Sequence, residues 1–154
     1  MNNRYNGNRY DNNRNNYNNN DNKSVTGKVT EKIKKGGKLS STLTIEDITL
    51  PEKDAYNIAS EIKGKLNTNQ LRKIFEQIKE TENDLPDMKV VKNKLYKLLP
   101  LVAYAVGRDN CPPDFFKLLE ACITDKALVD QEDVERLIEF LTSIVAYSKY
   151  LDKK

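Results

Sequence analysis

The sequence contains no histidine and only two cysteines in 154 residues. The absence of histidine excludes Ser-His-Asp and Cys-His nucleophile pairs, histidine acid–base catalysis and HExxH zinc sites. Cys111 and Cys122 do not form a CxxC pair. We therefore interpret them as two reduced, partly buried thiols, which is the usual state of cysteine in a cytosolic protein.

Glycine and long apolar runs are also scarce. Four of the six glycines precede residue 39, and only Gly64 and Gly107 follow it. A glycine-rich phosphate loop cannot be built from these two, so P-loop and Rossmann sites are not expected. No apolar run reaches the roughly 18 residues of a membrane span, and the N-terminus is polar. We therefore expect a cytoplasmic protein without membrane contact.

The N-terminal part of the chain is basic and low in complexity. Residues 1–38 carry nine Lys/Arg and three Asp/Glu, and 12 of the first 22 residues are Asn. Such a segment has too little apolar surface to offset the entropy of ordering, so we predict a disordered tail over 1–38 and a folded domain over 39–154. The Arg and Tyr residues of the tail suit RNA contacts, whereas drift in an AT-rich coding sequence explains the same composition without a function.

Helical patterns dominate after residue 50. Helices are expected over about 51–63, 67–82 and 90–108, then after Pro112-Pro113, and finally after a cap at Asp130. Asn67, Thr68 or Asn69 can cap the second of them. Pro100 predicts a kink or two short abutting helices, and residues 42–48 alternate like a strand or an extended lead-in. The last helix has apolar residues on about half its circumference, so it is either central to the bundle or buries a second face against a partner. The pattern predicts an all-α, compact bundle of five or six helices.

Two predicted helices carry basic faces. Arg72 and Lys79 share a flank of one helix, and Lys73 points away from its apolar side. On the next helix, a row of residues falls within an arc of about 80° at 100° per residue, namely Lys94, Lys97, Leu101, Tyr104 and Arg108. A basic row with an aromatic side chain suits phosphate and base contacts in RNA. The alternative is a solvated helix face with a partly buried Tyr104.

Carboxylates crowd the second half of the chain, at Asp109, Asp114, Asp125, Asp130, Glu132 and Asp133. A metal-dependent nuclease can use such groups without histidine. Helix capping explains the same residues without catalysis, because they fall at predicted helix starts and in loops.

Three segments resemble one protein family in order and spacing. Residues 66–75 (LNTNQLRKIF) resemble its L-T-T-S-Q-I-R-K segment, and residues 102–108 (VAYAVGR) resemble A-Y-x-A-G-R. Residues 137–150 (LIEFLTSIVAYSKY) resemble F-x-x-x-x-E-A-I-V-A-Y-x-K-Y, with Thr142-Ser143 in place of Glu-Ala and Ser148 in place of an aromatic residue or histidine. The family is the small helical subunit of the type III-A (Csm) CRISPR effector complex.

This resemblance implies a non-catalytic, RNA-binding structural subunit without metal or cofactor. Several copies are expected to line the channel that holds guide RNA and target RNA, beside the Csm backbone subunits and the large polymerase-like subunit. The family's basic residues correspond to Arg72, Lys73 and Arg108, which supports the RNA-facing role of the two basic helices. An RNA-binding protein outside CRISPR, and a carboxylate-dependent nuclease, are the alternatives.

Overall fold

The computed structural model describes residues 23–153, and all regular elements in that range are helical, which confirms the all-α prediction. In chain order they are α1 (Val25–Lys35), α2 (Leu39–Thr42), α3 (Ile45–Thr49), α4 (Asp54–Ile62), α5 (Thr68–Glu80), the 3-10 helix η2 (Thr81–Asp84), α6 (Met88–Gly107), α7 (Pro113–Cys122) and α8 (Gln131–Leu151). The bundle has more helices than the predicted five or six, because the segment before residue 50 adds α1, α2 and α3.

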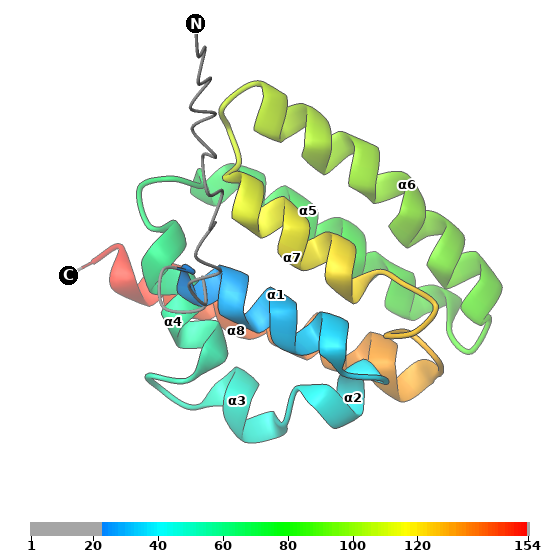
Figure 1. Ribbon diagram of the computed structural model, residues 1–154. Helices are drawn as coiled ribbons and strands as arrows, with labels where there is room; N and C mark the ends of the chain where they lie inside the picture. The colour runs from blue at the N-terminus through cyan, green and yellow to red at the C-terminus, as the bar shows by residue number, and fades with distance from the viewer. Residues whose placement is uncertain (1–22, 154) are drawn as a thin grey trace, which may run out of the picture.

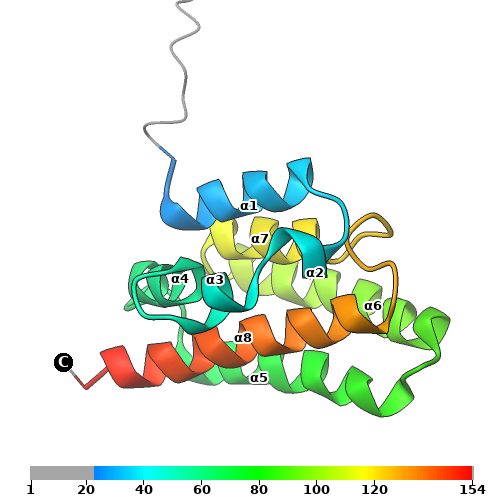
Figure 2. The same ribbon diagram turned by 90° about the horizontal axis from the view of Figure 1, so that it is seen from below.

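The last helix, α8, is central to the bundle. It packs against α2, α3, α4 and α5; Figure 1 shows it behind α1, and Figure 2 shows it between α2 and α3 above and α5 below. Apolar residues from across the apolar half of this helix are buried, namely Val134, Leu137, Ile138, Phe140, Leu141, Ile144 and Leu151. The wide apolar surface is therefore covered within this chain.

A capping box starts α8 and also fixes the segment before it. The Asp130 side chain accepts from the backbone N–H of Glu132, as its predicted cap role requires. The Asp133 carboxylate is fully buried and accepts hydrogen bonds from the backbone N–H groups of Val129 (2.9 Å) and Asp130 (3.1 Å). It accepts two more from the N–H (2.9 Å) and hydroxyl (2.6 Å) of Ser40. One side chain thus ties α2 to the start of α8.

Helix α1 corrects the predicted linker. Residues 25–35 form a helix that packs on α7 and α4, with Val29 and Ile33 buried. Its first backbone N–H groups are satisfied by the Glu61 carboxylate of α4, which accepts from Val25 at 2.7 Å. The sequence did not indicate this helix, because the segment is rich in Gly and Lys and its apolar side is a single row of residues. That row is buried only because α7 and α4 cover it. Residues 1–22 of the predicted tail lie outside the described residues.

The predicted strand or lead-in at residues 42–48 is wrong. Its residues fall largely into α2 and α3, and Thr44 and Asp47 form a capping box at the start of α3. Arg136 of α8 anchors the segment, because its guanidinium donates to the backbone carbonyls of Ser40 (2.9 Å) and Leu43. Anchoring by distant side chains lets such short helices persist here.

The remaining helices follow the sequence closely. Asn67 caps α5 by accepting from the N–H of Asn69, and Gly64, with φ of +76°, ends the preceding segment. The first predicted helix begins at Asp54 rather than Pro51, because Glu52 adopts a positive φ of 64°. Helix α6 is one helix through Pro100, so the alternative of two abutting helices is wrong.

Both thiols lie inside the bundle. Cys111 and Cys122 are buried and free. Burial raises the pKa of the Cys111 thiol to about 11 and that of Cys122 to about 12. Within residues 23–153, none of the helices has the length and apolar character needed to cross a membrane.

Candidate nucleic-acid interface

The outer side of α6 carries the predicted basic row. The inner side buries Val91, Leu95, Leu98, Val102 and Ala105 at helical spacing, which turns the row toward solvent. Lys94, Lys97, Leu101, Tyr104 and Arg108 are all exposed, with Leu101 at 58% and Tyr104 at 67%. The alternative of a partly buried Tyr104 is therefore wrong.

Tyr104 and Arg108 form a contact pair at the C-terminal end of α6. The guanidinium carbon of Arg108 lies 5.8 Å from the centre of the Tyr104 ring, and its Nη1 lies 3.5 Å from the phenol oxygen. The guanidinium thus lies over the ring and within reach of its hydroxyl, while the 67% exposure of Tyr104 leaves part of the ring open to solvent. An aromatic ring with an adjacent cation suits a nucleobase and its phosphate.

Lys94 and Lys97 differ in how free their charges are. The Lys94 ammonium lies 2.7 Å from a carboxylate oxygen of Asp84 in η2, and that hydrogen bond raises the pKa of Lys94. Among residues 23–153, no hydrogen bond or ion pair joins the Lys97 side chain to another residue. Lys97 is thus the freer of the two cations for an RNA phosphate.

On the opposite flank of α6, polar and charged side chains pair with each other. Tyr96 donates to Asp125 at 2.8 Å, and Lys92 lies 3.3 Å from the same carboxylate. Hydrogen bonds from Tyr96 and Lys92 and the Lys92 charge together lower the pKa of Asp125. This flank therefore presents paired charges, in contrast to the row that contains Lys97 and Arg108.

Helix α5 holds the other predicted cations, and all three are exposed. Lys79 lies over the Phe75 ring, with its ammonium 5.9 Å from the ring centre. Within the described part of the chain, the side chains of Arg72 and Lys73 have no hydrogen-bond or ion-pair partner. Both are free to meet a phosphate.

The structure separates these cations into two groups. Helix α5 lies between α6 and α8 (Figure 1), and Thr68, one turn before Arg72 on the same side, donates to Asp152 after α8. Arg72 and Lys79 therefore lie on the α8 side of α5, with Lys73 facing outward. The α6 row forms a separate surface, so the predicted residues are not one continuous strip.

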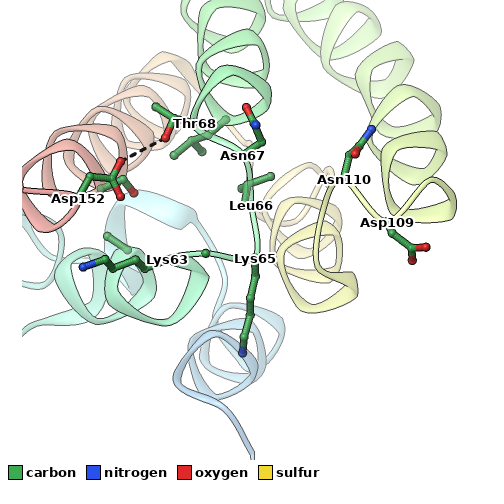
Figure 3. Close-up of a pocket in the computed structure, with 12 residues that line it drawn as sticks. Lys63, Lys65, Leu66, Asn67, Thr68, Asp109, Asn110 and Asp152 are labelled. Atoms are coloured by element: carbon green, nitrogen blue, oxygen red, sulfur yellow. Dashed lines mark hydrogen bonds between the residues drawn. The ribbon is translucent and has the colours of Figure 1, made fainter.

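One pocket joins the ends of the two basic helices. It has a volume of about 380 Å³ and lies between the start of α5, the turn after α6 and the end of α8 (Figure 3). Asn67, Asn110 and Lys65 line it together with Ser148, whose buried hydroxyl has no hydrogen-bond partner among residues 23–153. The sequence offered Asn67 as one of three candidate caps but gave no sign that Lys65 and Asn110 share a pocket with it.

The acidic residues of the nuclease alternative do not converge. Asp114 accepts from Ser24 at 2.8 Å, Asp125 pairs with Lys92, and Asp130 and Asp133 cap α8. Over residues 23–153, His, Cys, Asp and Glu do not gather in any group of three or more that suits a metal ion. Their positions fit structural roles.

The comparisons with known proteins bear on these surfaces. A protein-family model described as Csm2 Type III-A matches residues 46–154, which is most of the chain. The chain belongs to the Csm2 family. It is therefore a subunit of a type III-A CRISPR complex, and the alternative of an RNA-binding protein outside CRISPR falls away. No curated protein and no solved structure matches the chain.

The Csm2 match begins inside α3, so α1 and α2 lie outside it. Both basic helices lie within it, as do α7 and α8. The segment before residue 46 is nevertheless part of the same core, since Val29, Ile33, Leu39 and Leu43 are buried in it.

Proposed function

We propose that this Csm2-family protein is a non-catalytic RNA-binding subunit that lines the channel holding guide RNA and target RNA, in several copies. The observation that supports it best is the α6 row. Helix α6 contains no Asp or Glu, and its outer side combines Lys97 and Arg108 with an exposed aromatic ring. A surface of this kind attracts phosphates without reading sequence.

The cations of α5 extend the proposed contact. Arg72 and Lys73 fall in the segment that resembles the family's Q-I-R-K sequence, and both are exposed and unpaired within residues 23–153. With Lys79, Lys94, Lys97, Tyr104 and Arg108 they make up the proposed RNA-binding set. Two basic surfaces on one subunit suit two stretches of RNA, or RNA that passes around the end of the bundle.

The proposed partners follow from membership of the complex. They are the guide and target RNAs, the Csm backbone subunits, the large polymerase-like subunit and further copies of this chain. Exposed apolar residues away from the basic row, such as Ile45, Leu50 and Val129, offer protein contacts. The proposed location is the cytoplasm, and no metal or cofactor is proposed.

The test is the affinity of the assembled complex for target RNA when Arg72, Lys73 and Arg108 are all changed to alanine. A matched control removes three exposed lysines on other helices and turns, Lys28, Lys35 and Lys53. We expect the first triple variant to weaken binding of all RNA sequences alike. Its affinity should also fall less steeply with salt, by about one unit of slope per lost contact.

The control should bind as the wild type does. If the two triple variants assemble normally and bind target RNA equally well, the basic faces of α5 and α6 do not contact RNA. The nuclease alternative is tested in parallel by incubating the purified chain with RNA, with and without magnesium, where the proposal expects no cleavage.

A further inference from the structure

We infer that Tyr104, supported by Arg108, is a stacking platform for an unpaired RNA base, so that this face of α6 prefers single-stranded RNA to a closed duplex. The inference rests on the proposed RNA-binding function and makes it more specific. It implies that at least one nucleotide of the bound RNA is out of base pairing where it crosses α6.

The exposure of Tyr104 is the first observation. At 67% it is the most exposed large apolar or aromatic side chain within residues 23–153, and Leu101, one turn earlier, follows at 58%. A closed duplex offers phosphates and riboses to a helix passing along it, but no base face that a tyrosine ring can cover. An unpaired base does offer one, and aromatic stacking is the usual way to hold it.

The position of Arg108 is the second observation. Its guanidinium carbon lies 5.8 Å from the ring centre, with Nη1 3.5 Å from the phenol oxygen. This contact places a cation at the ring, where it can also meet the phosphate of a stacked nucleotide.

The charge along the row is the third observation. Lys97 lies about 10 Å before Tyr104 along the helix axis and Arg108 about 6 Å after it, at 1.5 Å per residue. A base on the ring thus has a cation on each side for the neighbouring phosphates. Because α6 carries no acidic residue, this row is complementary to a polyanion rather than to a mixed-charge protein surface.

The experiment measures binding of fluorescein-labelled RNA to the full chain at low salt. The same 12-nucleotide RNA is offered as a single strand and as a perfect duplex. The variants are Tyr104→Phe, which keeps the ring, and Tyr104→Leu, which keeps apolar bulk without it. Tyr96→Leu is the matched control, because Tyr96 is an exposed tyrosine on the other flank of the same helix.

We expect the wild type to favour the single strand, although phosphate contacts alone would favour the more highly charged duplex. Tyr104→Leu should bind the single strand roughly 5- to 100-fold more weakly, in line with the loss of one stacked base, and the duplex almost unchanged. Tyr104→Phe and Tyr96→Leu should stay within about twofold of the wild type.

Three results would overturn the inference. One is a wild type that binds duplex at least as tightly as the single strand. Another is equal single-strand binding by Tyr104→Leu and Tyr104→Phe. If the triple variant at Arg72, Lys73 and Arg108 still loses affinity in that case, the proposed RNA-binding function stands and only the stacking platform is wrong. The third is a Tyr104→Leu variant that binds RNA normally but fails to join the complex, which would make the ring a protein contact.

Discussion

The buried carboxylate of Asp133 is the most sharply testable feature of the fold. It accepts four hydrogen bonds, two on each oxygen, from Ser40, Val129 and Asp130, and it is 0% exposed. The change Asp133→Asn keeps the size of the side chain. It replaces one acceptor oxygen with an NH₂ group that can only donate.

The magnitude follows from counting donors. If the NH₂ group faces Val129 and Asp130, two backbone N–H groups lose their acceptor; if it faces Ser40, the hydroxyl can turn away but the backbone N–H cannot. At least one buried donor is orphaned, and the charge that strengthened the remaining bonds is gone. We expect the free energy of unfolding to fall by about 2–4 kcal/mol, since an unsatisfied buried group costs about 1–3 kcal/mol and a bond to a charged group contributes about 1.5–3.

The assay is urea unfolding followed by far-ultraviolet circular dichroism. Glu132→Gln is the control, because it removes a charge from the same first turn of α8 at an exposed position. The control should lower the free energy of unfolding by about 0.3–1 kcal/mol, because it removes a negative charge that interacts favourably with the helix dipole. If Asp133→Asn destabilised the protein no more than Glu132→Gln, Asp133 would not hold α2 against α8 as described.

Two further predictions concern the same core. Burial alone would raise the pKa of Asp133, but hydrogen bonds from Ser40, Asp130 and Val129 lower it below its ordinary 3.8. Asp133 therefore stabilises the fold above about pH 4, and this contribution is lost as the pH falls through the lowered pKa. Stability of the wild type should thus fall below pH 4 more steeply than that of Asp133→Asn, and parallel slopes in urea titrations from pH 2 to 6 would contradict this. A chain beginning at Leu39 should lose roughly 3 kcal/mol or more relative to one beginning at Lys23, because it lacks the buried side chains of α1; equal urea midpoints would show that α1 does not contribute to the core.

Where local chemistry decides structure, the sequence was a sufficient guide. Asp130 starts its helix as predicted, and Asn67 is the one of its three candidate caps that starts α5, because a cap is a contact between residues two or three positions apart. The wide apolar surface of the last helix was also predicted correctly, because the residues that are buried recur at the helical period. These features need no knowledge of distant parts of the chain.

Helix α1 could not be predicted in the same way. Its apolar side is thin, and its stability comes from α7, from α4 and from the Glu61 carboxylate 36 residues away. Likewise α2 depends on Arg136 and Asp133, more than 90 residues away. Interactions at such separations leave no periodic trace in the sequence.

In the candidate site, too, the local features could be predicted from the sequence and the packing of the helices could not. The exposed row on α6 followed from helical spacing, and the structure confirms that Tyr104 and Arg108 are exposed. That Asp84 pairs with Lys94, or that the Arg72 side of α5 borders α8, depends on how the helices pack. Helical spacing gives the faces of each helix but not their arrangement around one another.

The burial of both thiols has a practical consequence for placing RNA on this protein. A thiol with a pKa of about 11 or 12 has almost no thiolate at neutral pH, and Cys111 and Cys122 are also shielded from reagents. A single cysteine introduced at Asn93, an exposed position of α6 outside the proposed RNA-binding set, would therefore be the dominant site for maleimide dyes or cleavage probes. The distance from α6 to each nucleotide of a bound RNA is thus measurable without first removing the native cysteines.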